Sequence, residues 1–133
     1  MRFHLFIFII FSFLTFPGCD RPLSVLDMNS EAGIIGRWKQ TAEMYSIGDG
    51  TVHTRVLDDT VYRYLQFNAD NAIETNMEAF LPYKEYRLEK DSSVLFISKN
   101  QSLSKYRYIK AGDSLDIYLQ CIEACGVRLK RER

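Results

Sequence analysis

The feature that most constrains the fold is a series of short segments in which apolar and polar residues alternate. Turn signals separate these segments, which run from residue 34 to the end of the chain. About eight such segments follow one another at a spacing of roughly 8–12 residues, with no amphipathic helical period between them. Parallel strands need crossovers of about a dozen or more residues, which this spacing does not provide. The pattern therefore predicts an all-β, antiparallel domain over residues 34–133, and closure into an eight-stranded barrel would remove its exposed sheet edges. The predicted strands are residues 35–45, 61–67, 72–77, 83–88, 94–98, 105–110, 115–121 and 127–131.

Between the first two predicted strands, residues 51–59 have no clean pattern, so they predict either a short strand or part of a long loop. The first strand contains the only tryptophan, Trp38, and shows charged residues on its other face. The inward residues of the predicted strands are bulky, which favours a filled interior and at most a shallow site. These inward residues are Trp38, Met44, Leu65, Phe67, Tyr86, Leu88, Phe96, Leu115, Ile117 and Leu129.

The composition fits one globular domain with a modest core. The chain has 133 residues, of which 47% are hydrophobic and 14% are aromatic. The net charge is zero, so the chain offers no basic field to a nucleic acid or to an anionic membrane surface. We therefore expect no nucleic-acid partner.

The N-terminus has the layout of a secretory signal. A short positive region is followed by the apolar residues 5–16, a run too short to span a hydrocarbon core of roughly 30 Å. Pro17-Gly18-Cys19 comes next, and a small residue before a cysteine at this place resembles the lipobox of bacterial lipoproteins. Residues 1–18 would then be the signal peptide, and Cys19 would be the acylated first mature residue. An ordinary secretory signal and an uncleaved hydrophobic anchor are the alternatives.

The lipobox reading divides the rest of the chain into two parts. Residues 19–33 are the predicted lipidated cysteine and tether, and residues 34–133 are the predicted barrel domain. Acyl chains such as palmitate would attach the protein to a membrane without a spanning helix. The expected location is the cell envelope, on the outer membrane, with the barrel facing the periplasm or the cell surface.

Four short motifs, taken in their order and spacing, resemble the small lipocalin-like lipoproteins of Bacteroidota. The resemblance covers roughly residues 33–132, and the lipobox-like Cys19 fits the same family. The motifs are Ile-Ile-Gly-Arg-Trp-Lys at 34–39, Leu-Gln-Phe-Asn-Ala-Asp at 65–70, Gly-Asp-Ser-Leu-Asp-Ile at 112–117 and Cys-Ile-Glu-Ala-Cys at 121–125.

The resemblance implies an up-and-down, lipocalin-like barrel with an apolar cavity, and our first hypothesis is that its interior or mouth holds a small, mostly apolar ligand. The resemblance also implies that Gly36 and Trp38 form one end of the barrel, with a basic residue near the last strand lying across the indole. Arg128 is the candidate for that residue, because it stands in the last predicted strand.

Three cysteines are present, and acylation of Cys19 would leave Cys121 and Cys125 as a pair in an oxidising compartment. A turn between these two residues would bring their Cα atoms within the roughly 4.4–6.8 Å that a disulfide requires. The leading interpretation is a disulfide that closes the last hairpin. Two reduced thiols and a redox pair are the alternatives.

The sequence contains no constellation typical of an enzyme. His53 is the single histidine after the predicted signal, and no nucleophile elbow or oxyanion-hole glycines accompany it. The carboxylates Glu74, Glu85 and Asp116 are better explained as outward residues on polar faces than as a catalytic group. We therefore expect no catalytic residue, no metal site and no cofactor.

Tyrosines are frequent in the predicted strands, where they suit both binding sites and ordinary β-structure. Arg63 shares a strand face with inward residues, so it either needs a partner, marks the barrel mouth, or indicates that the faces are inverted. The candidate ligand-facing residues are Arg63, Leu65, Phe67, Tyr86, Tyr106 and Tyr108.

The sequence thus predicts a monomeric, lipid-anchored binding module for a small apolar ligand. The alternative is an interaction or inhibitor domain with a solid core, which would act on an envelope protein partner through its surface and loops. In either case the acyl chains on Cys19 would be the contact with the membrane.

Overall fold

A computed structural model of the protein describes residues 31–122 and 124–133. The predicted signal peptide, the predicted acylation site Cys19 and most of the predicted tether lie outside these residues. Within them, no helix is both long and apolar enough to cross a bilayer.

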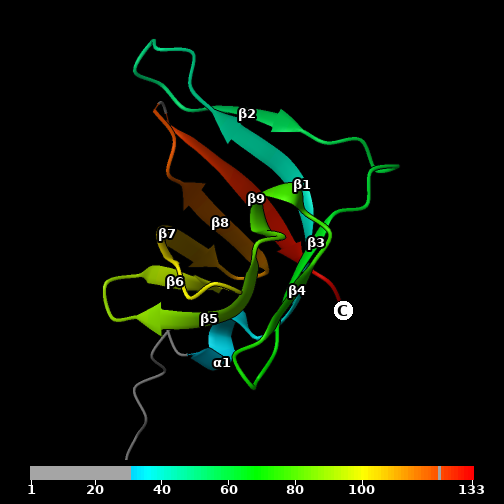
Figure 1. The fold of residues 1–133 in the computed structure, drawn as a ribbon. Helices are drawn as coiled ribbons and strands as arrows, with labels where there is room; N and C mark the ends of the chain where they lie inside the picture. Colours follow the sequence, from blue (N-terminus) through cyan, green and yellow to red (C-terminus); the bar gives the residue numbers. More distant parts are fainter. Residues whose placement is uncertain (1–30, 123) are drawn as a thin grey trace, which may run out of the picture.

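The regular structure of the described chain is mostly strand (Figure 1). A short helix comes first and a 3₁₀ turn interrupts the strands midway. The elements are α1 (Glu31–Ile34), β1 (Gly36–Tyr45), β2 (His53–Val56), β3 (Tyr64–Phe67), β4 (Ile73–Thr75), η1 (Glu78–Phe80), β5 (Tyr83–Glu89), β6 (Ser93–Ser98), β7 (Leu103–Ala111), β8 (Ser114–Leu119) and β9 (Cys125–Arg131).

Eight of the strands form one antiparallel sheet in the order β4-β3-β1-β9-β8-β7-β6-β5. The two ends of this sheet approach each other, since Ala72 bridges to Glu85 and the backbone N–H of Tyr86 donates to the carbonyl of Asn71 at 2.9 Å. The sheet is therefore a nearly closed eight-stranded barrel, and the predicted all-β barrel is confirmed.

Strand β1 serves two neighbours on one of its edges. Its first half, Gly36–Lys39, pairs with β3, and its second half, Ala42–Tyr45, pairs with β2. The register with β9 shifts between Gln40 and Ala42, which marks a β-bulge, and a bulge bends its strand and increases the local twist. Strand β2 consequently lies off the barrel path, and the β1–β2 hairpin projects from the end of the molecule opposite α1 (Figure 1).

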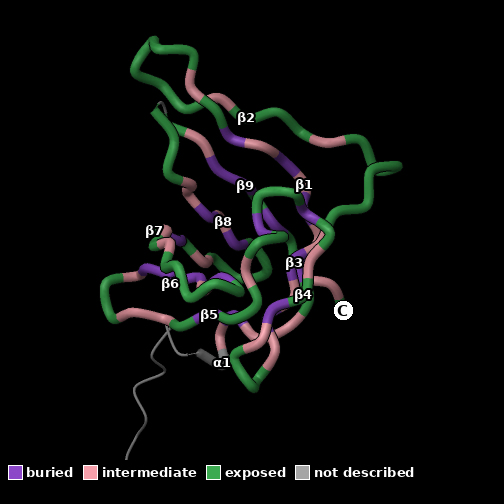
Figure 2. The backbone as a smooth tube through the Cα atoms, in the orientation of Figure 1, coloured by how far each residue is buried: buried purple, intermediate pink, exposed green. Residues whose placement is uncertain are grey.

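The inward faces of the barrel strands form one buried core, seen as the purple runs in Figure 2. The predicted inward residues are confirmed as buried, except that Leu88 is partly buried and packs against the core. Phe80 from η1 is fully buried and packs against Phe96 with ring centroids 5.2 Å apart. The 3₁₀ turn, which connects β4 to β5 in the chain, thus adds an aromatic ring to the core. This ring helps to fill the interior, as the bulky inward residues of the sequence predict.

Trp38 closes the α1 end of the barrel. Its side chain is 0% exposed, and its Nε1–H donates to the carbonyl of Ile34 at 2.7 Å. The guanidinium of Arg131 lies 4.3 Å from the indole and donates to the carbonyls of Gly33 and Ile35, at 2.7 Å each. The segment before β1 is therefore fixed over the barrel end by one arginine.

The expected role of Arg128 at this end is wrong. Arg128 is exposed and forms a two-pronged ion pair with Asp116, at 2.8 Å for each contact. Residues 128 and 131 lie on opposite faces of β9, and Arg131 is the register partner of Trp38. Gly36 does belong to this end, because its φ is +129° and an added Cβ would lie 2.8 Å from Nη1 of Arg131.

Candidate binding pocket at the open end of the barrel

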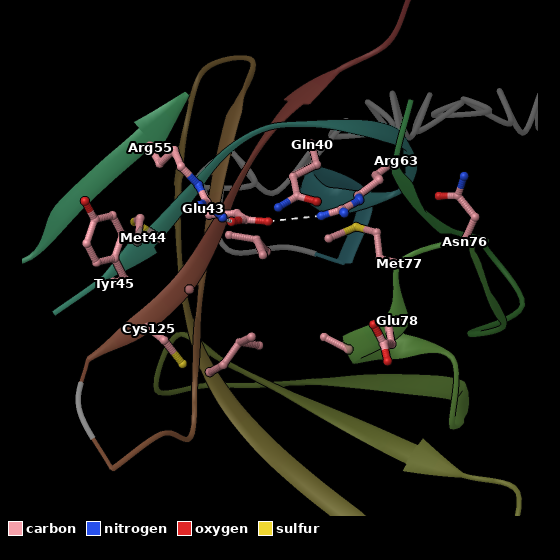
Figure 3. A pocket seen from close by; sticks show the side chains of 14 residues that line it. Gln40, Glu43, Met44, Tyr45, Arg55, Arg63, Asn76, Met77, Glu78 and Cys125 are labelled. Carbon is pink, nitrogen blue, oxygen red and sulfur yellow. Dashed lines mark hydrogen bonds and ion pairs between the residues drawn. The ribbon is translucent and has the colours of Figure 1, made fainter. Parts of the chain in front are cut away.

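The end of the barrel away from Trp38 contains a pocket of about 850 Å³ (Figure 3). Its walls come from β1, β2, β9, η1 and the chain around them. The lining residues are Gln40, Glu43, Met44, Tyr45, Arg55, Arg63, Asn76, Met77, Glu78, Ala79, Leu119, Cys125, Gly126 and Val127.

The deep part of the pocket is mostly apolar. Met44, Met77 and Val127 line it and are almost fully buried. Met44 and Val127 face inward because strand residues alternate between the two sheet faces, whereas Met77 directly precedes η1. Methionine side chains are flexible and polarisable, so this wall is able to adapt to different apolar shapes.

Gln40 is the polar exception in that wall. Its residue is 2% exposed, and its Nε2 lies 3.4 Å from the carbonyl oxygen of Ala42. Its Oε1 is buried and has no hydrogen-bond partner among the described residues. Since buried polar atoms are nearly always hydrogen-bonded in proteins, this acceptor is an unusual feature for the inside of a pocket.

Three charged residues form an ion-pair chain at the edge of the pocket. Glu43 accepts from Arg55 and, at 3.0 Å, from Arg63. The hydrogen bond and charge of Arg55, together with those of Arg63, lower the pKa of the Glu43 carboxyl against the opposing effect of its partial burial. Glu43 therefore stays ionised at neutral pH and holds both guanidinium groups.

The last hairpin closes the side of the pocket next to Tyr45. The structure places the sulfur atoms of Cys121 and Cys125 within disulfide-bonding distance, with Cα atoms 6.0 Å apart. Gly126 follows directly, and an added Cβ there would lie 2.5 Å from the carbonyl oxygen of Ile117 and 2.7 Å from Cε of Met44. A side chain at this position would push into both the neighbouring strand and the pocket.

The structure separates the residues expected to face a ligand. Arg63 lines the pocket and is exposed, which agrees with its interpretation as a residue of the barrel mouth. Leu65, Phe67, Tyr86 and Tyr108 lie in the buried core instead. They do not line the pocket, because Phe80, Phe96 and their neighbours fill that part of the barrel.

Tyr106 lies apart from the pocket, in a small hydroxyl cluster. Its hydroxyl is 2.9 Å from that of Tyr83, which donates to Ser104 at 2.8 Å. Burial, followed by the hydrogen bond and the charge of Tyr83, raises the pKa of Tyr106 to about 12. The cluster supports the packing of Tyr106 against Phe96, whose ring centroids lie 5.7 Å apart.

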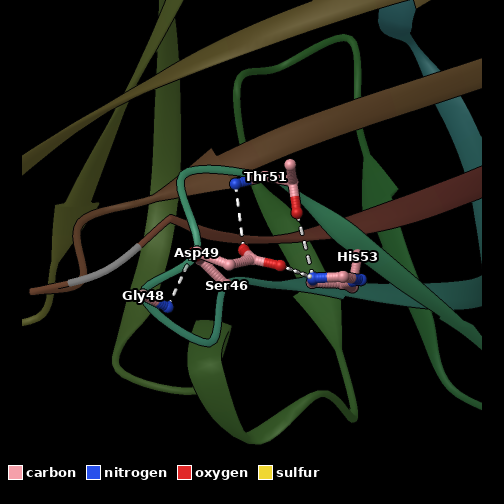
Figure 4. A network of polar contacts seen from close by, with 5 residues as sticks. All are labelled: Ser46, Gly48, Asp49, Thr51 and His53. Atoms are coloured by element: carbon pink, nitrogen blue, oxygen red, sulfur yellow. Dashed lines mark hydrogen bonds and ion pairs between the residues drawn. The ribbon is translucent and has the colours of Figure 1, made fainter.

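His53 takes part in a turn rather than in a catalytic arrangement (Figure 4). Its Nε2 contacts Oδ2 of Asp49 at 2.7 Å and Oγ1 of Thr51 at 3.0 Å. A Ser-His-Asp relay requires the hydroxyl and the carboxylate to engage different ring nitrogens, whereas both groups here meet the same one. The backbone N–H of Thr51 also donates to Asp49, and together with the side chains of His53 and Thr51 it lowers the pKa of the Asp49 carboxyl.

The scattered carboxylates have separate surface partners. Glu74 accepts from Asn68, Glu85 pairs with Lys84, and Asp116 pairs with Arg128. Within residues 31–122 and 124–133, no group of three or more histidine, cysteine or acidic side chains is arranged to hold a metal ion.

Sequence reasoning missed most of the pocket. Gln40 shares a strand face with Trp38, Ala42 and Met44, and a polar residue on that apolar face is a signal that the sequence contains. Glu43, Arg55 and Gly126 carried no such signal, because their positions depend on strand pairing.

No protein-family model, curated protein or solved structure matches the chain. The pocket and the fold are therefore interpreted from their own geometry.

Proposed function

We propose that the protein is a non-enzymatic binding module that takes a small, mostly apolar ligand into the pocket at the open end of its barrel. The observation that carries the proposal is a buried wall of Met44, Met77 and Val127 lining a pocket of about 850 Å³. Pockets for small organic ligands commonly have volumes of roughly 300–1,000 Å³ and mostly apolar walls with a few polar groups.

The ligand would occupy the mouth of the barrel and not its whole interior. The other end is filled by Trp38, Phe67 and Phe96, and each of these residues is at most 1% exposed. A ligand at the mouth would keep one side close to solvent, beside the ion pairs of Glu43.

A pocket-filling variant tests this proposal. Ala79 is exposed on η1 and lines the pocket, so Ala79→Trp should obstruct it with little effect on folding. Ala69 is an exposed residue outside the pocket, and Ala69→Trp is the matched control. The measurement is the fluorescence of N-phenyl-1-naphthylamine, an uncharged apolar probe, titrated with a chain that begins at Asp20.

We expect the wild type and Ala69→Trp to bind this probe with similar affinity, and Ala79→Trp to bind it about fivefold more weakly or worse, as overpacking predicts. Equal binding by all three proteins would contradict a site at the barrel mouth.

The proposal extends to the family and location that the N-terminus indicates, a lipocalin-like lipoprotein anchored to the outer membrane through Cys19. Cys19→Ser removes the only sulfur next to the predicted signal, so it should release the protein from membranes. The measurement is membrane fractionation of cells. Continued fractionation of Cys19→Ser with membranes would contradict acyl anchoring.

One observation favours the alternative, an interaction domain that uses its surface. The β1–β2 hairpin exposes three apolar side chains, Ile47 at 66% and Val52 at 51% in its loop and Val56 at 77% in β2. Exposed apolar residues that cluster on one projecting element suit a protein contact. If the probe fails to bind at the mouth, substitution of these residues is the next test.

A further inference from the structure

We propose that the ligand of this pocket is an uncharged apolar molecule that carries a hydroxyl or N–H group, and that this group donates a hydrogen bond to Oε1 of Gln40. The inference rests on the proposed function and adds the chemical class of the ligand. It is carried by one buried acceptor and by the charges around it.

The acceptor is Oε1 of Gln40, which has no hydrogen-bond partner among the described residues although its residue is 2% exposed. Figure 3 shows the side chain pointing from β1 into the pocket. A buried polar atom without a partner destabilises a protein, so a ligand that supplies the missing hydrogen bond gains affinity from it.

The orientation of the amide fixes which kind of group the ligand must present. Nε2 of Gln40 lies 3.4 Å from the carbonyl oxygen of Ala42. The reversed amide would place two oxygen atoms against each other, which is unfavourable. The atom left without a partner is therefore the oxygen, and only a donor such as a hydroxyl or an N–H group satisfies it.

The charges of the pocket favour an uncharged ligand. Arg55 and Arg63 both contact Glu43, and with Glu78 the charged lining residues sum to zero. An anionic ligand would have to compete with Glu43 for the two guanidinium groups, and a carboxylate has no proton to donate to Gln40. An alcohol or an amide meets both requirements.

Two isomeric probes separate the donor from the apolar body. 1-Octanol and 1-methoxyheptane have the same atoms, but only the alcohol donates a hydrogen bond. The full chain in phosphatidylcholine nanodiscs, labelled with ¹³C at its methionine methyl groups, would be titrated with each probe by NMR. The methyl signals of Met44 and Met77 report the pocket, and Met77→Leu assigns them.

The substitution Gln40→Met removes the acceptor at nearly constant size, and Gln66→Met repeats the change at a glutamine outside the pocket. Partition of a probe into lipid cancels when each probe is compared between wild type and variant. We expect Gln40→Met to weaken octanol binding about fivefold relative to its effect on 1-methoxyheptane, the contribution of one hydrogen bond. Gln66→Met should leave both affinities unchanged.

The outcomes distinguish this inference from the proposed function. Both probes could shift the methionine signals while Gln40→Met changes the affinity for both by the same factor. The inferred hydrogen bond to Gln40 would then be wrong, and the apolar site would remain supported. If neither probe shifts these signals, the proposed function fails and the inference with it. Octanoate binding tighter than octanol would overturn the uncharged class. Gln40→Leu is a second variant without an acceptor, in case Gln40→Met does not fold.

Discussion

At the scale of single residues, Arg131 combines several contacts at the closed end of the barrel. It covers the indole of Trp38 and donates to two backbone carbonyls of the segment before β1. It also lies against Gly36, the position where a side chain has no room. The closed end of the barrel thus depends on one guanidinium that joins the last strand to the first.

We predict that Arg131→Met lowers the free energy of unfolding by about 2–4 kcal/mol, since it removes a cation–π contact and two charge-assisted hydrogen bonds. Arg128→Met is the matched control on the same strand, and loss of its exposed ion pair should cost about 1 kcal/mol or less. Urea denaturation followed by Trp38 fluorescence measures both. An equal cost for the two variants would contradict the assignment of Arg131 to the indole.

The raised pKa of Tyr106 predicts a loss of stability at alkaline pH. The phenol ionises near pH 10 in the unfolded chain, but at about pH 12 in the folded one. Its stabilising contribution is therefore complete below pH 10 and is lost as the pH rises toward 12. Unfolding measured across this range should show a smaller decrease for Tyr106→Phe than for the wild type. An identical decrease in both proteins would rule out this phenol as the cause.

At the scale of strands and turns, the two-residue period of the sequence was sufficient to predict the barrel. The alternation of Trp38, Gln40, Ala42 and Met44 is the same in the sequence and in the burial of β1. Asn71 lies in a turn with a φ of +67°, a conformation that asparagine adopts more readily than most other residues. These features are local, because a strand side chain faces inward or outward according to its position alone.

Features that depend on pairing were harder to predict. Strand β2 has no clean alternation, because it pairs on one side only and most of its side chains are exposed. The error at Arg128 was avoidable, however. Val127 and Leu129 face inward, so the alternation of the strand puts Arg131 on their face and Arg128 on the other.

The disulfide gives a prediction for the last hairpin. Closing a loop between Cys121 and Cys125 should stabilise the protein by about 2 kcal/mol, because the loop is short. The oxidised protein should weigh less than its reduced form by two hydrogen atoms. Reduction should lower the free energy of unfolding, measured by urea denaturation, by about 2 kcal/mol. A reduced mass from a non-reducing preparation would contradict the disulfide.

At the scale of the whole molecule, the two ends of the barrel differ. One end is closed by Trp38, Arg131 and the segment before β1, and the other end holds the pocket. The sequence predicted bulky inward residues and hence a largely filled interior, but the place and size of the pocket could not be derived from it. They depend on where η1 places its pocket-lining residues and on how β1 bends at its bulge.

The central claim is that the open end binds a small apolar ligand while the closed end is solid. Native mass spectrometry of the chain from Asp20 onward, expressed in cells and purified without detergent, tests it most directly. We predict that the wild type and Ala69→Trp carry an added organic mass that disappears on denaturation, and that Ala79→Trp does not. A bare mass for all three proteins, or an added mass that Ala79→Trp retains, would contradict the account.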